Sequence, residues 1–221
     1  MKKLIFSEEL IEAAVFLDGD LPDFKNLRLD KSTKIIAADG AADKLLHNNF
    51  IPNIIIGDMD SIDLSKNIYN NIEILKDIDQ ETNDFEKILI FALNQKYRNI
   101  LIFGLHGGEL EHTLNNISVL LKYQHLFGSI IILDKDRYCL YIDQSIKLQL
   151  KKDELISIIP YPKCKIQTNG LYWELNNEWL EQGKREGARN KCKNENITIN
   201  LESGAYFLFF DNRYPKFIKF E

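Results

Sequence analysis

Short apolar runs alternate with segments of helical periodicity along the first 134 residues. Branched apolar residues dominate the runs, as in IIIG at 54–57, and such runs are typical of strands buried on both faces of a sheet. Strands that alternate with helices predict a parallel sheet joined by crossover connections. We expect strands at residues 13–19, 34–40, 54–57, 99–103 and 129–134.

Amphipathic helices are predicted between these strands. The clearest begins at residue 83, where Asn83 and Glu86 have the spacing of a capping box. Apolar side chains then recur with the period of a helix that buries one face, at Phe85, Ile88, Leu89, Ala92 and Leu93. We expect helices at residues 41–49, 83–97 and 112–123.

The pattern changes near residue 137, after which the helical stripes disappear. Apolar and polar residues alternate with period two at 145–152, 196–203 and part of 205–211, and prolines and glycines separate these runs. The predicted fold class is α/β. An N-terminal, mostly parallel sheet flanked by helices (1–137) is followed by a small C-terminal all-β domain that is sandwich or jelly-roll-like (138–221).

Two carboxylates directly follow the expected strand at 54–57. Gly57 allows the chain to turn, and Asp58 and Asp60 then stand at the carboxyl end of a strand, where open α/β sheets bind ligands. Acids two positions apart in a turn are able to share a hard cation such as Mg²⁺, which takes oxygen ligands and bridges to substrate phosphates. The alternative is a tight turn without a metal, because glycine, aspartate and serine favour turns in any case.

Further acidic or glycine-rich turns are expected at the same edge of the sheet, at 39–40, 79–84 and 104–112. In the last of these, Gly107 and Gly108 precede a helix. Such a glycine pair lets backbone N–H groups approach phosphate oxygens. A plain strand-to-helix turn has the same pattern and is the alternative.

Three further candidates for the site also have a purely structural interpretation. They are Asp84, His106 and His112. Asp84 also fits the first turn of a helix, where the helix dipole favours an acid. His106 and His112 are suited to phosphate binding or proton transfer, but solvated or packing histidines are the alternative. No zinc-ligand spacing accompanies either histidine.

Charge and cysteine content narrow the class of protein. A formal net charge of -5 argues against a general binder of nucleic acid or of anionic membranes, since both rely on basic patches. No apolar run is long enough to span a bilayer, and residues 1–14 are too polar for a signal peptide. The odd number of well-separated cysteines (Cys139, Cys164 and Cys192) favours reduced thiols and a cytoplasmic location.

A series of longer motifs occurs in a recognisable order. The first domain contains AADGAADKLL, IPNIIIGDMDSI, DQETNDFEKIL and GLHGGELEHTLNNISVLL, and the second contains TNGLYWELNN followed by GARN. On these motifs, residues 34–202 resemble the thiamine pyrophosphokinases. The resemblance implies an α/β domain that binds ATP and Mg²⁺, a β-sandwich domain that binds thiamine, and a homodimer with its sites between subunits. It also implies transfer of a pyrophosphoryl group from ATP to the thiamine hydroxyl, which gives thiamine diphosphate and AMP.

The same resemblance assigns roles to individual residues. The catalytic Mg²⁺ ligands would be Asp58, Asp60 and Asp84. Contacts to ATP are expected from Asp39, Gly40, Gly107, Gly108 and His112. Contacts to thiamine are expected from Gln80, Asp84, Glu111, Trp173 and Asn190. An aromatic wall such as Trp173 suits thiamine, which is cationic and aromatic, but a tryptophan on a strand of a β domain is more often part of the core.

One departure from the family pattern changes the charge beside the glycine pair. The family commonly has GGR with an acid two residues on, whereas this chain has Glu109 after Gly108 and Glu111 as the acid. A carboxylate at this position loses the bidentate phosphate contact that a guanidinium makes. Arg189 or Lys184 is expected to supply the missing positive charge to ATP.

Two other functions remain as alternatives. A catalytically degenerate homologue would bind thiamine without turnover, and Glu109 is the reason to consider it. A haloacid-dehalogenase-like phosphatase would use a strand-end aspartate as its nucleophile. That scheme also needs a later lysine and an acidic pair at another strand end, and nothing after residue 137 provides them convincingly.

Overall fold

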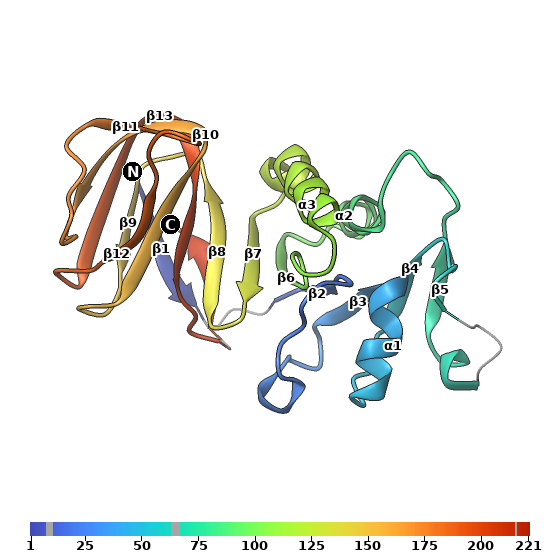
Figure 1. Cartoon of the computed structure of the whole chain (residues 1–221). Helices are drawn as coiled ribbons and strands as arrows, with labels where there is room; N and C mark the ends of the chain where they lie inside the picture. The colour runs from blue at the N-terminus through green and yellow to red at the C-terminus, as the bar shows by residue number, and fades with distance from the viewer. Residues whose placement is uncertain (8–10, 63–66, 215) are drawn as a thin grey trace. The chain divides into compact units, whose positions relative to one another are not determined.

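The computed structural model describes residues 1–7, 11–62, 67–214 and 216–221. The chain forms two compact units (Figure 1). Leu10–Lys135 is an α/β unit, and Met1–Glu9 together with Asp136–Glu221 is a β unit. The protein therefore has the mixed α/β fold that the sequence predicts.

Parallel strands form the sheet of the α/β unit. Their order is β7-β6-β2-β3-β4-β5, and every neighbouring pair in it is parallel. Side chains of β2, β4 and β6 are almost all buried, which explains why the sequence shows continuous apolar runs instead of alternation. The strands are β2 (Ala13–Phe16), β3 (Lys34–Ala38), β4 (Ile54–Gly57), β5 (Glu73–Lys76), β6 (Asn99–Phe103) and β7 (Ser129–Asp134).

Helices cover both faces of this sheet. Crossovers between parallel strands are right-handed, so the helix between β3 and β4 lies on one face and those after β5 and β6 lie on the other. Figure 1 shows this arrangement, with α1 on one side and α2 and α3 on the opposite side. The helices are α1 (Asp39–His47), α2 (Asp84–Asn94) and α3 (Leu110–Tyr123), with 3-10 turns at Phe24–Asn26, Asn67–Tyr69 and Gln124–Leu126.

The start of α2 is held by the expected cap, but only by half of the capping box. The side chain of Asn83 accepts a hydrogen bond from the backbone N–H of Glu86 at 2.9 Å. The carboxylate of Glu86 instead accepts hydrogen bonds from Lys122 and Tyr123 on α3. Glu86 therefore ties α2 to α3, which fixes the two helices on one face of the sheet.

The strand order reverses between β2 and β6. From β2 the chain proceeds to β3 on one side, and from β6 it proceeds to β7 on the other. Phe16 and Phe103, which end these strands, are cross-strand partners whose buried rings stack 4.6 Å apart. The loops that leave the two strands diverge over these rings, and such a reversal point is where open α/β sheets bind ligands.

The β unit is organised around two long strands, β10 and β13, which pair with each other in antiparallel fashion. Strands β8 and β9 pair with β13, and β11 and β12 pair with β10. The strands are β1 (Lys2–Ser7), β8 (Arg137–Ile142), β9 (Ile146–Gln149), β10 (Leu155–Asn169), β11 (Glu178–Glu181), β12 (Gly187–Lys191), β13 (Asn196–Asp211) and β14 (Phe217–Phe220).

The N-terminal strand corrects the expected division of the chain at residues 1–137 and 138–221. Strand β1 pairs with β9 in parallel and with β14 in antiparallel fashion, so residues 2–7 belong to the β unit. Both partners lie more than a hundred residues away along the chain, and no local pattern in KKLIFS reveals such a pairing.

Strand β13 is continuous where the sequence predicts two strands, at 196–203 and 205–211. Gly204 separates these runs and has φ +82, a conformation that strongly favours glycine. A Cβ atom at Gly204 would lie 2.0 Å from the carbonyl oxygen of Lys163 on β10. The glycine therefore marks a bulge inside one strand, at a point where two backbones come close. No helix in the described part of the chain is long and apolar enough to cross a membrane.

Candidate functional site

A cleft of about 430 Å³ opens at the reversal point of the α/β sheet. Its walls are the turn after β2 (17–19), the turn after β6 (104–109), and the loop that leads into α2 (79–84). Asp58, which follows β4, also lines it. Three of the four turns that the sequence placed at one edge of the sheet, at 57–61, 79–84 and 104–112, therefore contribute residues to one hollow, whereas Asp39 and Gly40 do not line it.

Three aspartates bring their carboxylate oxygens together beside this cleft. One oxygen from each of Asp39, Asp58 and Asp60 lies within 4.8 Å of the others. Met59, between two of them, has φ +66, so the turn reverses sharply and directs both flanking carboxylates toward the same point. The left-handed conformation is uncommon for a non-glycine residue and is held here by its contacts.

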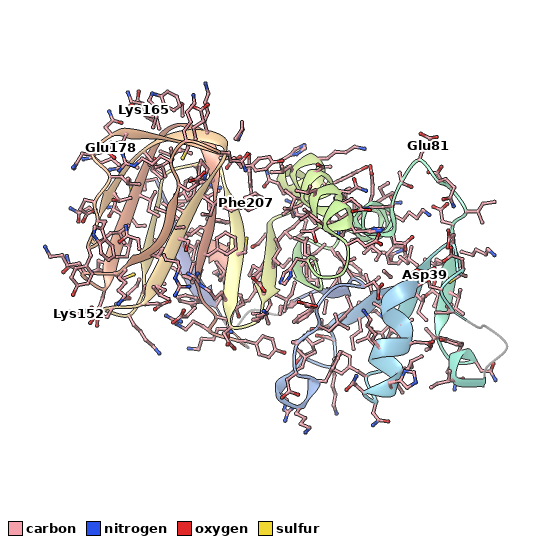
Figure 2. All side chains as sticks on the ribbon, viewed as in Figure 1. Asp39, Glu81, Lys152, Lys165, Glu178 and Phe207 are labelled. Atoms are coloured by element: carbon pink, nitrogen blue, oxygen red, sulfur yellow. The ribbon has the colours of Figure 1, made fainter. Side chains whose placement is uncertain are left out.

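Asp39 fixes the conformation of this turn. Its side chain is 3% exposed and accepts the backbone N–H of Met59 at 2.9 Å on one oxygen and that of Gly40 at 2.6 Å on the other. Asp39 is the first residue of α1 (Figure 2), where the helix dipole favours a negative charge. A Cβ atom at Gly57 would lie 2.7 Å from the Asp39 carboxyl carbon, which explains why a glycine ends β4.

Asp84 adds a fourth carboxylate from the first turn of α2. Burial, and then the neighbouring carboxylates of Asp39 and Asp58, raise the pKa of Asp84 to about 7. By contrast, hydrogen bonds from the Asp60 N–H and the Gln80 amide lower the pKa of Asp58. The cluster therefore has more negative charge than its surroundings compensate.

These residues fit a hard divalent cation. Carboxylate oxygens are the ligands that Mg²⁺ prefers, and an excess of negative charge is what a bound cation relieves. The expected ligands were Asp58, Asp60 and Asp84. The structure joins Asp39 to Asp58 and Asp60 in the closest oxygen group and leaves Asp84 adjacent to it.

The loop at 79–84 is shaped by its own side chains. Asp79 accepts hydrogen bonds from the backbone N–H of Glu81 at 3.1 Å and from the Thr82 hydroxyl at 3.0 Å. Gln80 donates to Asp58 at 3.2 Å, so the residue expected to contact thiamine lies beside the carboxylate cluster. Figure 2 shows Glu81 at the outer bend of the loop, away from Asp39.

The glycine pair lies in the turn after β6 that lines the cleft. Gly107 has φ +113 and Gly108 has φ +66, and a Cβ atom at Gly107 would lie 2.5 Å from the backbone nitrogen of Asp20. Both glycines line the cleft. Both have positive φ, a conformation that favours glycine in a tight turn, but only Gly107 is closely packed, because a Cβ atom at Gly108 would lie in open space.

The two histidines near this turn differ in position. His112 lines the cleft, and its Nε2 lies 3.4 Å from a carboxylate oxygen of Glu109. His106 is directed away from it and contacts Asp134 at 2.6 Å through Nε2. His106 therefore pairs with Asp134 and is not among the residues that line the cleft. Glu111 lies on α3 and is exposed.

The candidate residues of the β unit form a separate group. Trp173 is 63% exposed, so the interpretation as a core tryptophan is wrong. Asn190 is buried and clamps the tryptophan backbone: its amide donates to the Trp173 carbonyl at 2.7 Å and its oxygen accepts the Trp173 N–H at 3.3 Å. Glu174 accepts the N–H groups of Gly170 and Leu171, which further fixes this loop. The result is an exposed indole on a rigid support.

Arg189 and Lys184 differ as sources of positive charge. Arg189 has an exposed side chain and φ +55, and its backbone N–H donates to the Ser157 hydroxyl at 3.0 Å. Lys184 already forms an ion pair with Glu181 at 2.9 Å.

Sequence reasoning missed several residues of the cleft. Asp18 and Gly19 form an acid–glycine turn after β2, the same signal that drew attention to Asp39 and Gly40. Asn116 donates to the Leu105 carbonyl at 3.1 Å and links the glycine wall to Asn83. Lys87 is a charged residue of α2 that lies outside the apolar stripe of this helix, and nothing in the pattern indicates that it lines the cleft.

Two family models match this chain. One describes the thiamin pyrophosphokinase catalytic domain and matches residues 25–132, and the other describes the thiamin pyrophosphokinase vitamin B1 binding domain and matches residues 143–206. Together they cover well over half of the chain. The first match contains all of the aspartate cluster, and the second contains Trp173 and Asn190.

Individual relatives agree with these models. Thiamine pyrophosphokinase 2 of Arabidopsis thaliana is 29% identical over 226 residues, covering 86% of this chain and 83% of the relative. Thiamine pyrophosphokinase of Bacillus subtilis is 27% identical over 190 residues, covering 81% and 87%. The crystal structure of thiamine pyrophosphokinase from Bacillus subtilis superposes with a TM-score of 0.76 at 22% identity, over 91% of this chain and 99% of that one, so the fold is shared.

Proposed function

The chain belongs to the thiamin pyrophosphokinase family, and we propose that the aspartate-lined cleft is where it carries out the family's reaction. The reaction is transfer of a pyrophosphoryl group from ATP to the hydroxyl of thiamine, with thiamine diphosphate and AMP as products. The observation that carries this assignment is the convergence of Asp39, Asp58, Asp60 and Asp84 beside a cleft at the reversal point of the sheet. This function is favoured over a degenerate homologue and over a phosphatase.

The chemistry needs alignment and charge stabilisation more than covalent help. Mg²⁺ held by Asp58, Asp60 and either Asp39 or Asp84 would offset the negative charge of the polyphosphate. The glycine turn at 107–108, which also lines the cleft, would present backbone N–H groups to the phosphates. Gln80, which donates a hydrogen bond to Asp58, is proposed to contact thiamine near its hydroxyl.

A thiamine platform is proposed in the β unit. Trp173 offers an exposed indole face to a cationic aromatic ring, and Asn190 keeps its backbone in place. The match of residues 143–206 to a vitamin B1 binding domain supports this assignment.

Removal of the indole tests the platform. Trp173→Ala should raise the KM for thiamine about tenfold, because a cation–π contact contributes on the order of 1–2 kcal/mol. The KM for ATP should stay within twofold. Trp179 is 49% exposed in the same unit, and Trp179→Ala is the control that should leave both constants unchanged. Equal effects of the two substitutions would remove the assignment.

Arg189 is proposed to replace the arginine that the glycine turn lacks. Arg189→Ala should raise the KM for ATP about tenfold or more, since a hydrogen bond to a charged group contributes about 1.5–3 kcal/mol. Lys184→Ala should leave it unchanged, because Lys184 is already paired with Glu181. Steady-state kinetics with ATP as the varied substrate measures both. Unchanged kinetics in Arg189→Ala would disprove the role.

A homodimer with sites shared between subunits is proposed on the family resemblance. The catalytic and vitamin B1 binding matches fall in different units of the chain, which suits a site assembled from two copies. Light scattering should give twice the mass of one chain. Mixing Asp58→Asn with Trp173→Ala protein should partly restore activity, because exchanged dimers contain one site with neither substitution. No recovery after demonstrated subunit exchange would exclude shared sites.

Two further proposals concern the β unit and the compartment. We infer that the antiparallel strands of the β unit pack as a sandwich, with β10 and β13 as its longest members. A cytoplasmic location is supported by the cysteines, which are buried and are not joined in disulfides. Burial raises the pKa of Cys164 to about 11 and that of Cys192 to about 12, so these thiols are poor nucleophiles. Fractionation of cells checks the compartment, and reaction of the native protein with a thiol reagent checks the low reactivity of the cysteines.

Catalysis itself is tested by incubating the protein with Mg²⁺, ATP and thiamine and separating the nucleotides by chromatography. AMP and thiamine diphosphate in equal amounts are expected. Thiamine binding by calorimetry without AMP release would instead support the degenerate homologue and would show that Glu109 is not tolerated.

A further inference from the structure

Lys87 is a buried lysine inside an otherwise acidic cleft. It lies on α2 three residues after Asp84, lines the cleft, and has a side chain that is only 5% exposed. Lysine is almost never this buried unless a partner compensates its charge. The surroundings of its ammonium group therefore indicate what it does.

Two contacts hold the ammonium group. It donates a hydrogen bond to the backbone carbonyl of Asp77 at 2.9 Å and lies 3.8 Å from a carboxylate oxygen of Asp84. The backbone N–H of Asp77 in turn donates to the Gly57 carbonyl at 2.9 Å, directly before the turn that carries Asp58. The positive charge is thus fixed in position at the base of the cluster.

The charge of Lys87 acts on several carboxylates together. The pKa of Asp58 is lowered mainly by hydrogen bonds from the Asp60 N–H and Gln80, and to a smaller extent by the charge of Lys87. The pKa of Asp79 is lowered mainly by hydrogen bonds from the Glu81 N–H and Thr82, and to a smaller extent by the same charge. It also opposes the rise in the pKa of Asp84. A fixed cation that stabilises these carboxylates repels a second cation that approaches the same oxygens.

We propose that Lys87 is a built-in counter-charge that weakens the binding of a divalent cation to the nucleotide-free cleft, so that the cation is held firmly only together with the polyphosphate. This inference rests on the proposed Mg²⁺ role of the cluster. Lys87 reduces the attraction of the carboxylates for a cation, whereas the phosphates add both oxygen ligands and negative charge. The consequence is that metal and nucleotide are retained as one unit.

The contrasting role for Lys87 is that of a tether for the loop before α2. A tether would act through the bond to the Asp77 carbonyl, and its loss would loosen the cluster and weaken metal binding. The two roles therefore predict opposite changes in cation affinity. Lys87→Gln removes the charge and retains a hydrogen-bond donor, and Lys87→Met removes both.

The experiment measures Mn²⁺ binding by electron paramagnetic resonance, with and without α,β-methylene-ATP, in which the bond to be broken is replaced. Mn²⁺ takes the same oxygen ligands as Mg²⁺. Lys87→Gln should bind Mn²⁺ without nucleotide about tenfold or more tightly than the unsubstituted protein. The increase in Mn²⁺ affinity that α,β-methylene-ATP produces should be smaller in Lys87→Gln than in the unsubstituted protein. Lys87→Met, which covers the case in which the glutamine variant does not fold, should change in the same direction.

Lys122→Gln is the matched control. It removes the same charge from a lysine that is paired with Glu86 of α2 and that does not line the cleft, so its Mn²⁺ affinity should be unchanged. Unchanged or weaker Mn²⁺ binding in the folded Lys87 variants would overturn the proposal while leaving the metal role intact. Absence of Mn²⁺ binding to the unsubstituted protein even with the nucleotide analogue would overturn both.

Discussion

Asp58→Asn should reduce kcat/KM by about a thousandfold or more while leaving the fold intact. Asp58 belongs to the closest oxygen group and also accepts a hydrogen bond from the Gln80 amide, so it joins the proposed metal site to the proposed thiamine hydroxyl site. Asparagine keeps the size of the side chain but loses the charge that holds a divalent cation. Loss of one preorganised charge interaction commonly costs two to three orders of magnitude in rate.

The fold should survive this change because Asp58 is half-buried in a turn and caps no helix. Circular dichroism and thermal unfolding check this. Asp30→Asn is the control: Asp30 accepts hydrogen bonds from Ser32 in an exposed turn and does not line the cleft. Retention of more than a tenth of the activity in Asp58→Asn would remove the metal assignment.

Asp39→Asn should reduce kcat/KM by about a hundredfold or more and also weaken Mn²⁺ binding in the presence of nucleotide. Each oxygen of Asp39 accepts one backbone N–H, from Gly40 and from Met59. Asparagine has one acceptor oxygen, so its NH₂ group would face one of these N–H donors. The turn that aligns Asp58 with Asp60 would lose its support together with a negative charge.

This prediction separates two roles for Asp39. The family resemblance places Asp39 at the phosphates of ATP, whereas the geometry groups its carboxylate with those of Asp58 and Asp60. If Asp39 served only the phosphates, the substitution would raise the KM for ATP and leave Mn²⁺ affinity unchanged. If Asp39 belongs to the metal group, Mn²⁺ affinity falls as well.

The parallel sheet was predictable because its strands are buried on both faces. Continuous runs such as IIIG at 54–57 have no other simple interpretation when helical stripes lie between them. Strand β5 escaped this reasoning. Its sequence, EILK, is half polar because it lies at the edge of the sheet and buries little. Pairings over long sequence distance, such as that of β1 with β9, have no local signal at all.

The site was predictable to the extent that it depends on strand ends. Parallel strands bring their following turns together, so Asp58, Asp84, Gly107 and Gly108 were expected to converge and do so. The hydrogen bonds that the Asp39 and Lys87 side chains make were not predictable. They depend on which way each side chain turns from its helix, toward the Met59 N–H and the Asp77 carbonyl respectively.

Trp173 shows how a common pattern misleads. A tryptophan in a small β domain usually fills the core, but this one lies in a turn between β10 and β11. The hydrogen bond that Asn190 donates and the one that the Glu174 carboxylate accepts hold the turn, so the indole is not needed for packing and remains exposed. Exposure of a large aromatic side chain on a rigid support is a stronger indication of binding than its presence in the sequence.

The measurement that tests the central claim most directly follows the phosphorus resonances of ATP by ³¹P NMR in the presence of Mg²⁺ and thiamine. Pyrophosphoryl transfer in this cleft predicts that AMP and thiamine diphosphate appear together, at equal rates and without ADP. Formation of ADP with thiamine monophosphate would contradict the account, because it would mean attack at the γ-phosphorus and transfer of a single phosphoryl group.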